Sequence, residues 1–139
     1  MGLCRYLWCF FAFGSLCLLA DQSSTNDVVT LQGGVIPVPG AVTNLNFKTE
    51  TGATYRLLRT SYSEALFLDT NLHTKILLLK GKILPDKKAF EVTGNLHSIK
   101  DAKVQDLYYY CDICSIASSI PGLCQCCREP VRLVEEPAK

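Results

Sequence analysis

An excess of charge of one sign is absent from this sequence. Its 139 residues include 14 Lys and Arg and 13 Asp and Glu residues, which gives a formal net charge of +1. No long basic run occurs, whereas nucleic-acid-binding domains and proteins that attach to anionic lipids carry clustered Lys and Arg. The sequence therefore predicts no nucleic-acid partner and no attachment to an anionic membrane surface.

Histidine and methionine are also scarce. His73 and His97 are the two histidines, and the single methionine is Met1. We expect His73 in a loop and His97 exposed on the polar face of a strand. No nucleophile–base pair, phosphate-binding loop or pair of carboxylates stands out, so the sequence predicts no catalytic constellation. A non-enzymatic protein is expected.

The first 20 residues have the features of a signal peptide. Arg5 precedes an apolar run over residues 6–19, and Ala20 stands before a polar stretch. The run is short for a membrane span. We therefore expect cleavage after Ala20 and export to a periplasm or to the outside. Leu18 is larger than the small residue usual at its position, so an uncleaved membrane anchor is the alternative.

Removal of residues 1–20 changes the counts of charges and cysteines. Arg5 is the one charged residue lost, which leaves 13 basic and 13 acidic residues. Three of the eight cysteines (Cys4, Cys9 and Cys17) leave with this segment, and the remaining five all lie between residues 111 and 127. An odd number cannot pair completely within one chain. The count fits four metal ligands plus one thiol, and it equally fits two disulfides plus one thiol.

A mainly β domain is predicted over residues 27–107, after a disordered linker at 21–26. Short runs that alternate or are rich in β-branched residues predict strands, over 27–31, 45–49, 53–60, 75–84, 89–99 and 104–110. Pro37 and Pro39 place residues 35–40 either at a sheet edge or in an extended arm. A capping-box pattern from Ser61 to Glu64 predicts a short helical turn over 65–68.

The order of these elements resembles a small OB-type barrel. Short strands with one helix between them, and with Gly81 and Gly94 inside two of the strands, indicate a sheet that curls strongly. A generic β-sandwich or meander is the alternative. The face with Glu91, Thr93 and Asn95 lacks the aromatic and basic residues that nucleic-acid-binding OB-folds use.

Residues 108–135 form a cysteine-rich segment that we expect to be a zinc-ribbon-like tail. Four cysteines have the spacing C-x2-C-x9-C-x2-C, namely Cys111, Cys114, Cys124 and Cys127. Two such pairs can direct four thiolates to one point, as tetrahedral zinc requires. Cys126 lies inside the second pair as an extra ligand, a free thiol or an intermolecular bridge. Residues 131–134 are expected to pair with 108–110, and 116–120 to form a helical turn.

The pattern Tyr109-x-Cys111-x2-Cys114, with Pro121-Gly122-x-Cys124-x2-Cys127, resembles the small heavy-metal-binding domain of bacterial metal-efflux components. That family has Tyr-x-Cys-Pro-Met-His-Pro followed by Pro-Gly-x-Cys-Pro-x-Cys-Gly-Met. The resemblance implies a site for a thiophilic metal. This sequence has Cys114 in place of the family's histidine and lacks both methionines, which favours zinc with four thiolates over copper.

Two other interpretations of the cysteines remain open. An exported chain meets an oxidising compartment, where Cys111–Cys124 and Cys114–Cys127 disulfides would give a stapled interaction domain. A thiol–disulfide oxidoreductase is the third, although no thioredoxin-like βαβ pattern surrounds the motif. The favoured prediction is an exported metal-binding protein, with zinc as its metal, copper or no metal as the alternatives, and a protein partner for the barrel.

Overall fold

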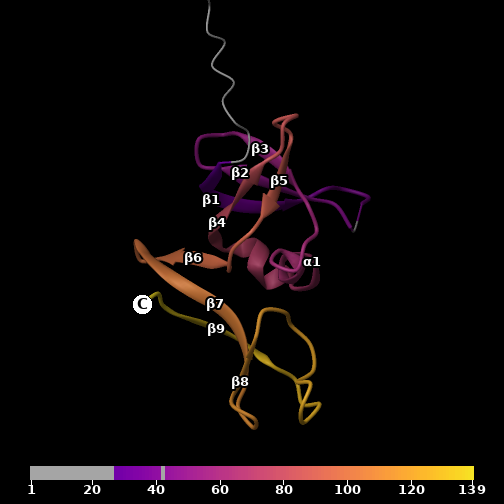
Figure 1. Ribbon diagram of the computed structural model, residues 1–139, viewed down its shortest axis with the longest axis vertical. Coiled ribbons are helices and arrows are strands. Elements are labelled where there is room, and N and C mark those ends of the chain that lie inside the picture. Colours follow the sequence, from indigo (N-terminus) through magenta and orange to yellow (C-terminus); the bar gives the residue numbers. More distant parts are fainter. Residues whose placement is uncertain (1–26, 42) are drawn as a thin grey trace, which may run out of the picture.

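The computed structural model describes residues 27–41 and 43–139, so the predicted signal peptide and the whole predicted linker lie outside the described residues. Figure 1 shows a mainly β molecule with one short helix and one 3₁₀ turn. Its elements are β1 (Val28–Pro37), β2 (Leu45–Thr49), β3 (Thr54–Leu57), α1 (Glu64–Leu68), η1 (Thr70–Thr74), β4 (Ile76–Ile83), β5 (Ala89–Val92), β6 (His97–Lys100), β7 (Lys103–Cys111), β8 (Ile116–Ser118) and β9 (Arg132–Pro137). Within the described residues, 27–41 and 43–139, no helix is long and apolar enough to cross a membrane.

Strands β1 to β5 close into a five-stranded barrel (Figure 1). Its strand order is β1-β2-β3-β5-β4, and β4 returns to β1. All neighbours are antiparallel except β3 and β5. Between β3 and β4, α1 and η1 place Ala65, Leu66 and Leu72 in the core. The predicted OB-like barrel with one short helix is confirmed.

Strand β1 pairs with two different neighbours. Its first half pairs with β4 and its second half with β2, and Gly33 takes part in both registers. A Cβ atom at Gly33 would lie 2.0 Å from the carbonyl oxygen of Lys48, so this close approach requires glycine. The strand continues to Pro37. The prediction that the strand ends at Leu31 was therefore wrong, because the glycine lets one strand bend without ending. Residues 34–37 pair with β2 alone, which agrees with the expected edge position.

The single strand predicted over 89–99 is two strands. β5 pairs with the end of β4, while β6 pairs with the start of β4 and also with β7. Residues 93–96 connect these two positions. At the β4–β5 contact, a Cβ atom on Gly81 would lie 2.1 Å from the carbonyl oxygen of Glu91. The expected strong coiling at an interior glycine therefore occurs at Gly81.

We predict that Gly81→Ala destabilises the barrel by about 1–3 kcal/mol or more, because the methyl group would overlap the backbone of β5. Gly34→Ala is the matched control, since a Cβ atom there meets nothing within 4 Å, and its effect should stay within about 0.5 kcal/mol. Urea unfolding of both variants measures the difference. Equal free energies of unfolding would contradict the close approach.

Helix α1 begins without the predicted capping box. Its N-cap is Ser63, not Ser61, and no side chain caps the helix. The buried Ser63 hydroxyl instead donates a hydrogen bond to the Leu58 carbonyl at 2.7 Å and accepts one from the Thr60 N–H at 2.8 Å. Glu64 pairs with Arg59. Ser63 therefore closes the loop between β3 and α1 on itself, and the Thr60 hydroxyl joins this loop to the barrel by donating to the Val92 carbonyl at 3.2 Å.

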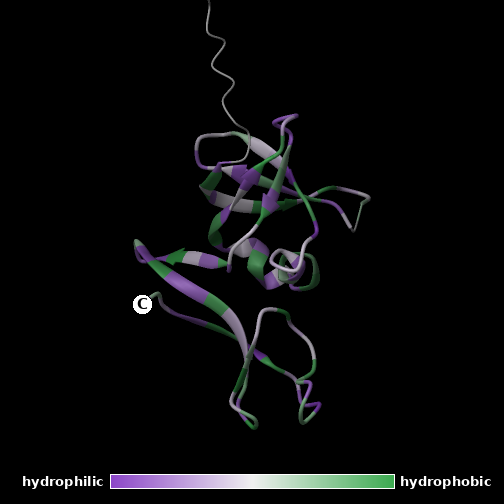
Figure 2. Ribbon diagram, viewed as in Figure 1, coloured by the Kyte–Doolittle hydropathy of each residue, from purple (hydrophilic) through white to green (hydrophobic). Residues whose placement is uncertain are grey.

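Strand β7 extends from the barrel into the cysteine-rich ribbon. It continues past residue 107, which is the predicted boundary between the β domain and the cysteine-rich segment. Alternate residues from Gln105 to Cys111 are buried, and Figure 2 shows hydrophobic bands separated by longer hydrophilic stretches along β7. Leu107 and Tyr109 belong to the barrel core. As expected for three consecutive tyrosines on a strand, one ring is buried, while Tyr108 and Tyr110 are half-buried on the opposite face.

The predicted pairing of residues 131–134 with 108–110 is confirmed and is longer than expected. β9 pairs with β7 over six residue pairs, from Arg132 opposite Tyr110 to Pro137 opposite Gln105. Glu135 of β9 accepts hydrogen bonds from the Lys75 ammonium at 2.8 Å and from the Ser98 hydroxyl. The Lys75 ammonium, together with Ser98, holds the pKa of Glu135 below its ordinary value. The last strand is thereby tied to the junction between η1 and β4 and to β6.

We predict that Tyr109→Phe destabilises the fold by about 1.5–3 kcal/mol, the range for a hydrogen bond to a charged group. The Tyr109 hydroxyl donates to Asp69 Oδ2 at 2.8 Å and so joins β7 to the segment between α1 and η1. Tyr110→Phe removes the same atom from a half-buried ring and is the matched control. Similar urea midpoints for the two variants would show that this hydrogen bond contributes little.

Candidate metal centre

Four cysteine sulfurs converge at the far end of the ribbon. The four-cysteine cluster comprises Cys111, Cys114, Cys124 and Cys127, whose Sγ atoms all lie within 4.8 Å of one another. Cys111 Sγ and Cys127 Sγ are 3.4 Å apart. In a tetrahedral zinc–thiolate site, metal–sulfur distances of about 2.3 Å separate the sulfurs by about 3.8 Å. The cluster therefore has the donors and the spacing to hold a metal ion.

The first ligand is positioned by the strand that ends at it. Cys111 is the last residue of β7 and is 1% exposed, on the same face as Tyr109. Side chains two residues apart on a strand share a face. Packing of Tyr109 in the barrel core therefore also directs Cys111 inward.

The two C-x2-C segments have the same backbone conformation. The N–H of Ser115 donates to the Cys111 carbonyl at 2.8 Å, and the N–H of Arg128 donates to the Cys124 carbonyl at 3.0 Å. Each donor is the residue after the second cysteine, and each has a positive φ, 55° and 64° respectively. Such values are uncommon in residues other than glycine and often occur at functional sites. The chain thus forms two equivalent turns, each of which presents two sulfurs.

The second turn is placed opposite the first by a small hairpin. Gly122 has a φ of 126°, which favours glycine, and its carbonyl accepts the Val131 N–H at 3.0 Å. Leu123 and Pro130 form an antiparallel bridge on either side of the turn. β9 then starts at Arg132, opposite Tyr110. The Pro121-Gly122 pair therefore has the role that its turn chemistry indicates.

Residues 116–120 do not form the predicted helical turn. Ile116–Ser118 is strand β8, which pairs with the end of β7 so that Cys111 lies opposite Ile116. The positive φ of Ser115 reverses the chain directly after the first cysteine pair, so a hairpin forms where a helix was expected. The first turn is thus the tip of the β7–β8 hairpin.

Backbone N–H groups favour the thiolate form of one ligand. Those of Cys127 and Cys126 point to the Cys124 sulfur and lower its pKa to about 7. The neighbouring Cys126 and Cys127 thiols and burial raise the pKa of Cys114. A thiolate is the metal-binding form of cysteine, so the turn around Cys124 is prepared for a cation.

An ion pair braces the ribbon beside the cluster. Arg132 of β9 contacts both carboxylate oxygens of Asp112, which lies between the first two cysteines, at 2.8 and 3.0 Å. Its guanidinium also lies 5.8 Å from the centre of the Tyr110 ring. The pKa of Asp112 is lowered by its hydrogen bond to Arg132. Cross-strand contacts of this kind orient the first turn relative to β9.

Cys126 is the exposed member of the group. It is not one of the four convergent sulfurs, although it directly precedes Cys127 in the sequence. An open cavity of about 410 Å³ borders it, lined largely by apolar residues of the ribbon such as Ile116, Ile120 and Leu123. The structure therefore places a fifth thiol at the outer edge of the four-cysteine cluster.

Neither histidine belongs to the cluster. His73 lies in η1, where its Nε2 atom is 2.7 Å from the Leu66 carbonyl oxygen. His97 is half-buried, with Nδ1 2.8 Å from Asp106 Oδ1. The expectation of an exposed His97 was wrong, because β7 covers one edge of β6 and brings a carboxylate to the ring.

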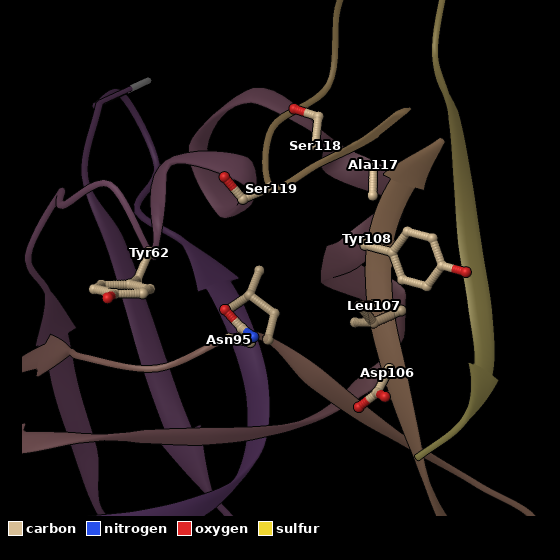
Figure 3. Close-up of a pocket in the computed structure, with 9 residues that line it drawn as sticks. Tyr62, Asn95, Asp106, Leu107, Tyr108, Ala117, Ser118 and Ser119 are labelled. Carbon is tan, nitrogen blue, oxygen red and sulfur yellow. The ribbon is translucent and has the colours of Figure 1, made fainter. Parts of the chain in front are cut away.

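A second cavity, of about 370 Å³, lies where the barrel meets the ribbon (Figure 3). Figure 3 shows Tyr62 and Asn95 on the barrel side and Ala117, Ser118 and Ser119 across from them. Its one carboxylate is Asp106, which is paired with His97. The Tyr108 hydroxyl points toward β9. The cavity thus presents a mixed polar and apolar wall without convergent metal ligands.

Comparisons of the chain with protein-family models, with curated proteins and with solved structures gave no match. The properties of the site therefore follow from its own residues.

We predict that Cys124→Ser lowers the affinity for a thiophilic metal by more than about 100-fold, because loss of outer-shell partners alone typically costs 10–100-fold. Cys126→Ser is the matched control and should keep the affinity of the unaltered protein. Competition with a chromophoric zinc chelator measures both. Equal losses of metal affinity in the two variants would show that Cys126 contributes as much to metal binding as Cys124 does.

Proposed function

We propose that this protein is an exported, non-enzymatic metal-binding protein whose ribbon holds zinc through the four-cysteine cluster. The observation that carries the proposal is the convergence of four sulfurs within 4.8 Å of one another. Zinc accepts four thiolates in a closed tetrahedral site and needs no other donor. The resemblance to the heavy-metal-binding domain of efflux components supports a thiophilic cation.

Zinc is favoured over copper by the donor set. Four thiolates suit tetrahedral zinc, whereas thioether ligands such as methionine help to select Cu(I). Met1 is the single methionine of the sequence and belongs to the predicted signal peptide. A copper site of the efflux-component type would also need the histidine that Cys114 replaces.

A metal site also accounts for the backbone conformation around the cysteines better than two disulfides do. Disulfides would join the sulfurs as two separate pairs, each at about 2.05 Å. Here all four sulfurs share one centre, and two equivalent turns aim them at it. N–H groups directed at the Cys124 sulfur stabilise negative charge, which a metal thiolate has and a disulfide lacks.

We expect the protein purified from its own compartment to contain one zinc ion per chain and to begin at Asp21. Before denaturation, the exposed Cys126 should react with a thiol reagent, and after denaturation with a chelator all five cysteines should react. Elemental analysis, thiol titration and intact mass measure these quantities. Absence of zinc together with a single reactive thiol after denaturation would mean two disulfides and would overturn the proposal.

A further inference from the structure

Strand β8 forms an open edge of the sheet, at the end of the ribbon that lies far from the barrel (Figure 1). It pairs with β7 and has no second neighbour among the described strands. β9 occupies one edge of β7 along residues 105–110, so β6 and β8 share the other edge. The Leu107 N–H donates to the Leu96 carbonyl on this shared edge at 3.1 Å. Because alternate residues of a strand direct their backbone groups to the same edge, Tyr109 and Cys111 direct theirs to β8.

The backbone of Ala117 therefore points away from β7. Tyr109 lies opposite Ser118 and Cys111 lies opposite Ile116, so these two pairs exchange the backbone hydrogen bonds between β7 and β8. Ala117 lies between them and turns its N–H and C=O groups outward. It is exposed, and no other backbone group of the described residues bonds to it. An edge with free backbone groups is a template for pairing with another strand.

The two free edges of the ribbon differ in charge. Strand β9 carries Arg132, Glu135 and Glu136 and ends at Pro137. Charged residues and proline are the usual means by which proteins prevent an edge from pairing with another chain. Strand β8 has the sequence Ile-Ala-Ser and contains neither. The edge at β9 is therefore protected against further strands, whereas the edge at β8 is not.

Apolar side chains surround the unprotected edge. Ile116, Ile120 and Leu123 are 47%, 38% and 62% exposed, and they line the cavity of about 410 Å³ beside β8. None of the described residues that line this cavity is charged. Arg128 and Glu129, the exposed residues that follow the second cysteine pair, have opposite charges. Two identical faces of this composition can meet without burying an unpaired charge, which would be costly.

We propose that a second copy of this chain docks on β8, so that the two β8 strands pair antiparallel about a two-fold axis at Ala117. The opposed Ala117 residues then exchange two N–H···O=C bonds, and the sheets of the two copies become continuous. A contact of this symmetry uses the same surface on both copies and closes at a dimer. The apolar side chains of each copy cover those of the other. This inference goes beyond the proposed function and does not require a bound metal ion.

The test measures the mass of the purified full chain by sedimentation equilibrium at micromolar to millimolar concentrations. A phosphine reductant keeps the exposed Cys126 from forming an intermolecular disulfide, so a reversible dimer is the expected result. Ala117→Pro removes the outward N–H, and Leu123→Lys places a charge in the apolar face. Each should raise the dimer dissociation constant by about tenfold or more. Leu68→Lys, at a comparably exposed leucine of α1, is the matched control and should leave the constant unchanged.

The possible outcomes separate the second copy from other occupants of this edge. A monomer throughout the concentration range would overturn the inference and would leave the edge to a different partner. A dimer that both variants retain would place the contact elsewhere and would also overturn it. Because the Ala117 N–H is not used within the chain, Ala117→Pro should keep the circular dichroism spectrum; if it does not, Leu123→Lys decides alone. Zinc content measured on the same samples distinguishes failure of the metal site from failure of the dimer.

Discussion

The side-chain alternation of β7 is the constraint on which the barrel and the ribbon both depend. One face of this strand buries Leu107 and Tyr109 in the barrel core and, two residues later, Cys111 in the four-cysteine cluster. A shift of the strand by one residue would turn all of these side chains to the opposite face. Barrel packing therefore fixes the direction of the first thiolate before any cation binds. β9 adds the second constraint, because its pairing with β7 and the contacts of Glu135 fix where the second cysteine pair returns.

Between β8 and β9 the chain has far fewer backbone partners. Over residues 119–131, the Leu123–Pro130 bridge and the turns around Gly122 and Cys124 supply the backbone pairing. Binding of a metal by four thiolates contributes free energy to whatever part of the chain must be ordered to form the site. Such a contribution would fall on this segment, since Cys111 is already held by β7. The outer turn of the ribbon would therefore gain more order from a bound ion than the barrel would.

The sequence allowed the barrel and the cysteine cluster to be predicted because both depend on local patterns. Alternation predicted the strand around Phe47, an apolar run predicted the strand around Leu79, and the C-x2-C spacing identified the four sulfurs that converge. The errors have non-local causes. β1 was predicted to end at Leu31, and residues 89–99 were predicted to form one strand. Both predictions failed because the observed strands depend on which neighbour pairs with each half. The strand at Ile116 was missed because it depends on a positive φ at Ser115. Serine, unlike glycine or asparagine, does not indicate a positive φ in a sequence.

The charge around the cluster bears on the kind of metal site that the ribbon forms. Four thiolates and one divalent ion leave about two negative charges, which a closed structural site usually shields by burial and hydrogen bonds. Here Arg132 is engaged by Asp112, so the guanidinium largely neutralises that carboxylate and offsets little of the thiolate charge. Two of the four ligands are also half-exposed. Negative charge on the cluster would therefore face solvent mainly at Cys114 and Cys127, whereas Cys111 and Cys124 are shielded by burial.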